Sequence, residues 1–242
     1  MNARLLPTVL ALGCFCTPYP DPTVSSVVTV ALSPANDASV CPADGFCIMN
    51  AQVCLGASDP NPAVTAMLTL SSGTWLVAPE ASTPNSIVVT PGPDCDDAQF
   101  QVGTAAGPVF VQATVGGYTN TGSAVLAAAP VSDISIVPSA VALGGIEGGT
   151  ASFGLEAVAV PAPPGRALST GTRIEFSLSS VQPMGTNAIV APDNVAVDAT
   201  GTAMTSIFAD PDVTSVTVTA TAVSADGVTL QAKSYTITSQ GP

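Results

Sequence analysis

The feature that most constrains the fold is a series of short runs in which apolar residues alternate with threonine or serine. In the clearest run, at 216–222, Val216, Val218, Ala220 and Ala222 alternate with threonines. Such a period-two pattern buries one face of a strand and leaves the other face in water. Similar runs recur at intervals of about ten residues, which is the spacing of an antiparallel β-sandwich. With 21 Gly and 22 Pro spread along 242 residues, long helices are not expected.

The runs fall into two groups, so the sequence predicts an all-β chain of two tandem β-sandwiches, at 24–130 and 131–242. The expected strands are 27–32, 51–57, 64–70, 87–89, 98–102, 109–115 and 123–128 in the first sandwich, and 133–137, 152–160, 173–178, 194–197, 203–209, 215–222 and 228–238 in the second. Segment 106–115 is similar to segment 214–222, which indicates an internal repeat. The short Ala/Pro linker at 127–130 predicts a semi-rigid rod.

Residues 1–13 have the layout of a secretory signal peptide. Arg4 precedes an apolar stretch at 5–13 that is too short to cross a bilayer. The tetrapeptide Ala11-Leu12-Gly13-Cys14 resembles a bacterial lipobox, which implies a mature chain that begins at a lipidated Cys14 and continues in a proline-rich spacer at 14–23. By the same resemblance, Phe15 after the lipid-bearing cysteine favours the outer membrane. An ordinary cleaved signal of a secreted protein is the alternative.

The remaining cysteines agree with an exported protein. Four of them lie within the first predicted sandwich, and an even number in an exported chain predicts two disulfides. Three pairings are possible; we favour Cys41–Cys47, which closes a small loop, together with Cys54–Cys95, which joins distant strands. A metal site is the alternative, but the spacings contain no Cys-x-x-Cys pair. Cys16 is left over in the spacer.

The chain is poor in cations. It has 4 Lys and Arg residues against 17 Asp and Glu, no histidine, a formal net charge of −13, and no Lys or Arg between Arg4 and Arg166. This balance repels nucleic acid and anionic membranes, so membrane contact is expected only through a lipid anchor. It also removes the residues that most often serve in acid–base catalysis and metal ligation. Neither an enzymatic activity nor a cofactor is expected.

Two motifs in the second predicted sandwich resemble the bacterial immunoglobulin-like domains of invasin and intimin. One is Val197-Asp198-Ala199-Thr200-Gly201-Thr202-Ala203-Met204-Thr205-Ser206-Ile207, followed by Val216-Thr217-Val218-Thr219-Ala220-Thr221; the other is the upstream set Gly165, Leu168, Gly171, Ile174 and Phe176. The sequence departs from the family at Pro161-Ala162-Pro163-Pro164, where a different turn is usual, and it resembles the family only weakly over 24–130. The resemblance implies two immunoglobulin-like sandwiches in a surface protein. It implies structural roles for Gly201 in a tight turn and Ala203 at the start of a strand, and no binding residue.

Few residues are candidates for ligand binding. Asp94, Asp96 and Asp97 offer the hard oxygens that calcium prefers, but they lack the spacing of an EF-hand loop, and a solvated turn explains them as well. Trp75 and Tyr118 are candidates for carbohydrate binding, with a place in the core as the alternative for Trp75. The Thr-rich run 216–222 is a candidate for pairing with a partner strand at an exposed sheet edge.

The sequence therefore predicts a non-enzymatic lipoprotein of the bacterial cell envelope, at the outer membrane or cell surface. We expect it to act as a structural or adhesive immunoglobulin-like module toward an unknown protein or glycan. A calcium- or carbohydrate-dependent extracellular binding module is the alternative.

Overall fold

The structure is a computed structural model that describes residues 28–36, 38–56, 65–77, 85–91, 95–138 and 151–238. These residues form sixteen strands in four antiparallel sheets, with no helix among them. Within these ranges there is accordingly no helical segment that is long and apolar enough to cross a membrane. The all-β fold expected from the alternating runs is confirmed.

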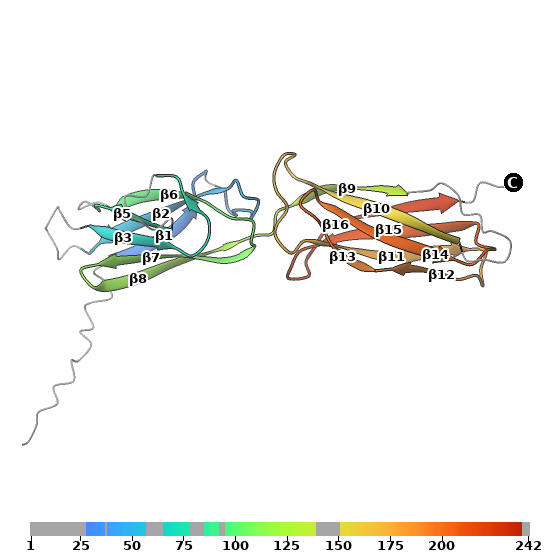
Figure 1. Cartoon of the computed structure of the whole chain (residues 1–242). Helices are drawn as coiled ribbons and strands as arrows, with labels where there is room; N and C mark the ends of the chain where they lie inside the picture. The colour runs from blue at the N-terminus through green and yellow to red at the C-terminus, as the bar shows by residue number, and fades with distance from the viewer. Residues whose placement is uncertain are drawn as a thin grey trace, which may run out of the picture.

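The first sandwich packs two four-stranded sheets face to face, with the strand orders β1-β2-β6-β4 and β5-β3-β7-β8 (Figure 1). Its strands are β1 (Val28–Pro34), β2 (Ile48–Leu55), β3 (Ala66–Leu70), β4 (Thr74–Trp75), β5 (Ser86–Val89), β6 (Asp96–Gln101), β7 (Gly107–Val115) and β8 (Tyr118–Leu126).

The second sandwich repeats this arrangement with the strand orders β9-β10-β14-β12 and β13-β11-β15-β16. Its strands are β9 (Val131–Pro138), β10 (Ala151–Pro161), β11 (Arg173–Gln182), β12 (Ala188–Ala191), β13 (Asn194–Ala196), β14 (Thr202–Ala209), β15 (Ser215–Val223) and β16 (Thr229–Thr238). Adding eight to each strand number of the first sandwich reproduces the order in the second. The internal repeat expected from the sequence is thus present in the topology.

Each sandwich has its own core, formed by the inward-facing residues of its two sheets. The buried residues of β7 alternate with solvent-facing ones because successive side chains of a strand point to opposite faces, and β15 shows the same alternation. The buried sets are Val109, Val111, Ala113 and Val115 in β7, and Val216, Val218, Ala220 and Ala222 in β15.

The turn before β14 bears out the structural roles that the family resemblance implied. Asp198 Oδ1 accepts hydrogen bonds from the backbone N–H groups of Thr200 at 2.8 Å and Thr202 at 2.9 Å, which closes the turn. Gly201 adopts φ +82°, and a Cβ there would lie 2.6 Å from the carbonyl oxygen of Ala159. Only glycine fits this position without strain. Ala203 is the second residue of β14.

One expectation about sheet edges is wrong. The Thr-rich run 216–222 lies in β15, which pairs with β11 on one side and with β16 on the other. Its backbone donors and acceptors are used on both sides, so β15 cannot add to a partner's sheet. Its threonines instead form cross-strand pairs, such as Thr217 Oγ1 with Thr236 Oγ1 at 2.9 Å and Thr219 Oγ1 with Ser234 Oγ at 2.8 Å.

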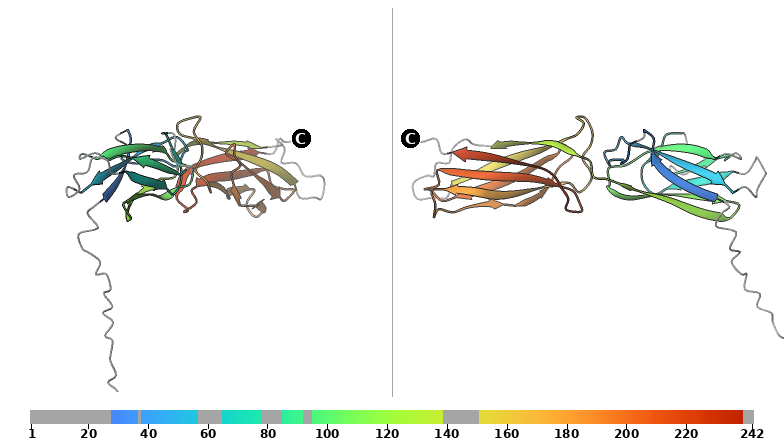
Figure 2. Two further views of the ribbon diagram at one scale, coloured as in Figure 1. Left: turned by 60° about the vertical axis from the view of Figure 1, so that its left-hand side comes forward. Right: turned by 180° about the vertical axis from the view of Figure 1, so that it is seen from behind.

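The two sandwiches lie end to end, as Figures 1 and 2 show from three directions. The linker residues Ala127–Pro130 leave β8 at one end of the first sandwich and lead directly into β9. Val28, the first described residue, lies at the far end of the first sandwich, where its carbonyl oxygen accepts from Asn120 Nδ2 at 2.7 Å. Thr238, the last described residue, pairs with Ser215 at the far end of the second sandwich. The described chain therefore begins and ends at opposite ends of the pair.

Candidate functional site at the domain junction

The sandwiches meet through loops, and hydrogen bonds cross directly between these loops. The β10–β11 loop of the second sandwich, residues 162–172, contacts the β1–β2 and β6–β7 loops of the first. Ala167 N donates to the carbonyl oxygen of Asp44 at 3.3 Å, and Thr170 N donates to that of Thr104 at 2.7 Å. The hydroxyl oxygens of Thr104 and Thr170 also lie 2.8 Å apart. The covalent linker is thus not the sole connection between the two sandwiches.

Ser169 is a buried polar contact of this junction. Its side chain comes from the second sandwich and is 3% exposed. Its hydroxyl accepts from the linker N–H of Ala129 at 2.7 Å and donates to the carbonyl oxygen of Ala43, in the first sandwich, at 2.9 Å. One hydroxyl therefore satisfies two buried backbone groups, one in the linker and one in the first sandwich, each of which would be costly to leave unpaired.

Arg166 provides the charged contact of the junction. Its Nη1 lies 3.7 Å from Oδ2 of Asp44, whose side chain is buried. The guanidinium carbon also lies 4.7 Å from the centre of the Phe46 ring, within the range of a cation–π interaction. Because a buried carboxylate needs a counter-charge or several hydrogen-bond donors, Arg166 of the second sandwich helps to stabilise Asp44 of the first.

A disulfide closes the loop that carries Asp44. Cys41 and Cys47 are bonded, with their Cα atoms 5.8 Å apart. Within this loop, Asp44 Oδ1 accepts from the backbone N–H groups of Phe46 at 2.8 Å and Cys47 at 3.0 Å. The disulfide and the carboxylate together define the conformation in which Asp44 and Phe46 face Arg166.

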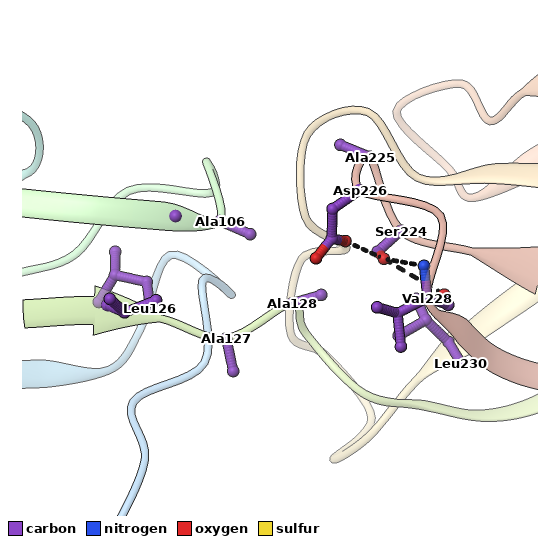
Figure 3. A pocket seen from close by; sticks show the side chains of 11 residues that line it. Ala106, Leu126, Ala127, Ala128, Ser224, Ala225, Asp226, Val228 and Leu230 are labelled. Carbon is purple, nitrogen blue, oxygen red and sulfur yellow. Dashed lines mark hydrogen bonds between the residues drawn. The ribbon is translucent and has the colours of Figure 1, made fainter.

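A hollow of about 410 Å³ lies beside the linker (Figure 3). Ala127 and Ala128 form part of its wall, and the β15–β16 turn forms the wall on the side of the second sandwich. Its polar residues are used within that turn: the Ser224 hydroxyl donates to the Asp226 carboxylate and accepts from Val228 N at 3.0 Å. That hydroxyl bond holds the pKa of Asp226 below its usual value. The hollow therefore offers small apolar side chains and little that could orient a ligand.

Comparisons with known proteins identify the fold. No family model and no curated protein matches the sequence. Among solved structures, the Yersinia pseudotuberculosis adhesin InvE is similar over 90% of this chain, with 17% identity and a TM-score of 0.59. The chain spans 60% of the length of that structure. The fold is therefore a tandem of two immunoglobulin-like β-sandwiches, similar to that adhesin.

Other structures of the same kind match this immunoglobulin-like tandem less well. Yersinia pseudotuberculosis InvD is 16% identical over 89% of this chain and 58% of its own, with a TM-score of 0.37. Invasin, described as a bacterial integrin-binding protein, is 16% identical over 88% of this chain and 41% of its own, also with a TM-score of 0.37.

The two disulfides of the tandem are the pairs that the sequence analysis favoured. Beside Cys41–Cys47, a bond joins Cys54 at the end of β2 to Cys95 just before β6. Cys14 and Cys16 lie outside the described residues, so lipidation of Cys14 stays a prediction.

Only two of the three calcium candidates lie among the described residues. Asp94 lies outside the described residues. Asp96 and Asp97 begin β6, where Asp96 Oδ1 accepts from Asp97 N at 3.0 Å. Across the described ranges, no three His, Cys, Asp or Glu side chains are grouped so that they could hold a metal ion.

The two aromatic candidates for carbohydrate binding, Trp75 and Tyr118, differ in their exposure to solvent. Trp75 belongs to the core, because its side chain is buried and packs edge-on against Phe100, with ring centres 5.5 Å apart and planes at 73°. Its indole N–H donates to the carbonyl oxygen of Asn85 at 2.9 Å. Trp75 is therefore not a binding platform. Tyr118 is exposed at the β7–β8 turn, at the end of the first sandwich away from the junction.

Sequence reasoning did not identify the junction residues Asp44, Arg166 and Ser169. Serine and aspartate in loops are common, so neither stood out. Two signals were nevertheless available: Arg166 is the first cation after a long stretch without one, and Asp44 lies in the loop closed by the favoured Cys41–Cys47 pair.

Proposed function

We propose that the protein is a non-enzymatic, lipid-anchored protein of the bacterial envelope that holds two immunoglobulin-like domains as one extended unit. In this proposal the unit serves as a structural or adhesive module at the outer membrane or cell surface. The observation that carries the proposal is the junction, where Ser169 and Arg166 bond the second sandwich to the first. A rod of this kind would carry its distal domain away from an anchor at Cys14. The likeness in fold to an adhesin supports the surface role.

The buried polar residues are all used within the fold. Six polar side chains are buried within the described ranges, and each takes part in a hydrogen bond within the fold. They are Asp44, Ser86, Ser169, Thr172, Thr205 and Ser224.

Anchoring is tested in cells that express the full chain. We expect metabolic labelling with palmitate to mark the protein and Cys14→Ala to remove both the label and its membrane association. Cys16→Ala is the matched control, because it changes a neighbouring cysteine and should leave the label unchanged. A mature N-terminus at a residue other than Cys14, found by mass spectrometry, would refute the lipid anchor.

The surface role is tested with the same cells. Protease added to intact cells should remove the sandwiches if they are displayed outside. Cells that carry the anchored chain should adhere to a host-cell layer, or keep their envelope intact under detergent stress, better than cells with Cys14→Ala. Equal behaviour of the two strains in both assays would count against a structural or adhesive role. Calcium at about millimolar concentration should leave the melting temperature unchanged, because a cation that bound only the folded state would raise it.

A further inference from the structure

An exposed face of the first sandwich carries a row of uncharged carboxamide side chains. On β2, Asn50 and Gln52 alternate with buried Ala51 and Val53 and so point to the same outer face. On β6, Gln99 and Gln101 face the same way. The register places Asn50 directly opposite Gln99. Neighbouring strands are about 4.8 Å apart, so the two side-chain amides can contact each other.

The Asn50–Gln99 pair leaves one amide NH₂ group and one amide oxygen without a partner. Gln99 Nε2 donates to Asn50 Oδ1 at 3.0 Å. This bond leaves the side-chain NH₂ group of Asn50 and the side-chain oxygen Oε1 of Gln99 with no partner among the described residues. Rotating both amides by half a turn exchanges the roles of the two residues and again leaves one donor and one acceptor free. The pair therefore offers adjacent polar groups of opposite kind on an open surface.

An apolar wall lies beside this pair, toward the domain junction. A hollow of about 520 Å³ extends from Gln99 past Ile48 and Phe46 to Arg166 and Pro163 of the second sandwich, and the Asp44 partner of Arg166 also lines it. Its size is that of a typical small-ligand site. The Phe46 side chain is 49% exposed, and the ring is held by Arg166 at 4.7 Å. Because Arg166 and Pro163 belong to the second sandwich, the hollow exists only while the two sandwiches stay in this arrangement.

The chemistry of this face selects among partner classes. The net charge of −13 repels anionic ligands, and the cross-strand row Ser33, Asn50 and Gln99 is itself uncharged. The nearest charged side chains are Asp97, two positions from Gln99 on the same face of β6, and Arg166 and Asp44 in the hollow, which pair with each other. An extended peptide would need a free strand edge, but at this site β2 lies between β1 and β6, and residues Thr74 to Leu76 cover β6 from Gln101 to Gln99. Sugar hydroxyl groups both donate and accept hydrogen bonds, and the C–H face of a sugar ring is apolar. A neutral glycan therefore fits both the amide pair and the wall beside it.

We infer that this face, formed by Asn50, Gln99, Ile48 and Phe46, binds neutral glycan chains. Adjacent hydroxyls would bond to the free groups of the amide pair, and a sugar ring would pack against Ile48 and Phe46. The inference rests on the proposed adhesive role and gives it a class of partner. It places the site on the outer face of a sheet, next to the junction that orients it.

Nuclear magnetic resonance of the purified, ¹⁵N-labelled chain tests this site directly. Neutral oligosaccharides of glucose, mannose and galactose are titrated in separately, with a sialylated oligosaccharide as the anionic comparison. We expect at least one neutral sugar to shift the side-chain NH₂ signals of Asn50 and Gln99, and the sialylated one to shift neither. If all neutral sugars leave these signals unchanged up to about 10 mM, a concentration that would reveal even weak binding, the site is refuted.

Matched variants test whether sugar binding depends on this face. Asn50→Ala combined with Gln99→Ala should weaken sugar binding about tenfold or more, since two hydrogen bonds are lost. Gln112→Ala is the control, because Gln112 is an exposed carboxamide on β7 in the opposite sheet, and its loss should leave binding unchanged. Binding that survives the double variant would overturn the assignment.

A cell assay distinguishes failure of this inference from failure of the proposed function. If anchored cells adhere to a host layer equally well after periodate has destroyed its glycans, the partner is a protein and the glycan site is wrong, whereas the adhesive role stands. If anchored cells do not adhere although the purified chain binds sugar, the glycan site stands and the adhesive role is wrong.

Discussion

Replacing Ser169 with alanine tests whether the two sandwiches act as one unit. The change removes a hydroxyl that accepts from Ala129 N and donates to the carbonyl oxygen of Ala43. Ala129 is 1% exposed and Ala43 is fully buried, so water reaches neither group easily. A buried group left unpaired costs about 1–3 kcal/mol, so the loss at two groups is about 2–4 kcal/mol once partial relaxation is allowed for.

The single tryptophan of the chain makes this loss measurable in a specific way. Trp75 lies in the core of the first sandwich, whereas Ser169 lies in the second. Urea unfolding followed by Trp75 fluorescence therefore reports the first sandwich after a change made in its neighbour. With a denaturant slope of about 2 kcal/mol per M, the expected loss lowers the midpoint by about 1–2 M urea.

The control is Ser177→Ala, which removes an exposed serine hydroxyl from β11 of the same sandwich and should leave the Trp75 transition unchanged. If Ser169→Ala also leaves it unchanged while the variant remains folded, the sandwiches unfold independently. The junction would then be a contact without consequence for stability, and the argument for a single extended unit would fail.

Two further predictions concern charged residues. Arg166→Ala should lower the free energy of unfolding, followed by Trp75 fluorescence, by about 1–2 kcal/mol, because the Asp44 pair and the cation–π contact are lost. In the Arg166→Ala background, Asp44→Asn should then destabilise the protein less than it does in the parent. Strictly additive effects in this double-mutant cycle would contradict the pairing. The second prediction uses Asp198, whose pKa is held below its usual 3.8 mainly by the Thr200 hydroxyl. A lowered folded-state pKa stabilises the fold fully above pH 3.8, and this contribution is lost as the pH falls through the folded value. Asp198→Asn should therefore have a lower melting temperature than the parent at about pH 6, and the difference in melting temperature, measured by circular dichroism, should narrow below pH 4. A difference that stays constant with pH would contradict this prediction. Asp212→Asn, at an exposed aspartate, serves as the control.

Much of the fold could be predicted because strand alternation is a local property of the sequence. Runs such as 109–115 and 215–222 show the period-two pattern within a single strand and need no knowledge of their neighbours. Strand β4 (Thr74–Trp75) was missed because two residues are too short to show a period, and β12 (Ala188–Ala191) was missed because all four of its residues are apolar and show no alternation. What makes each of them a strand is its pairing with β6 or β14, which is fixed only when the sheet forms.

The junction was harder to predict because burial there arises between domains. Nothing local to Ser169 indicates that its hydroxyl is enclosed, since the enclosing atoms lie in the linker and in the loop that contains Ala43. The departure from the family pattern at Pro161–Pro164 is informative in retrospect. Those prolines lead into the β10–β11 loop, the segment that supplies Arg166 and Ser169 to the junction.

The long stretch without cations has a structural consequence at this junction. A buried carboxylate in the first sandwich can be stabilised by backbone N–H groups or by a positive side chain. Asp44 uses both, but between Arg4 and Arg166 the sequence has no Lys, Arg or His to offer. Its counter-charge must therefore come from the second sandwich, and it does so through Arg166. The ion pair of Asp44 therefore forms between the two sandwiches and not within the first one. Because of this charge distribution, the stability of the first sandwich depends on the position of the second.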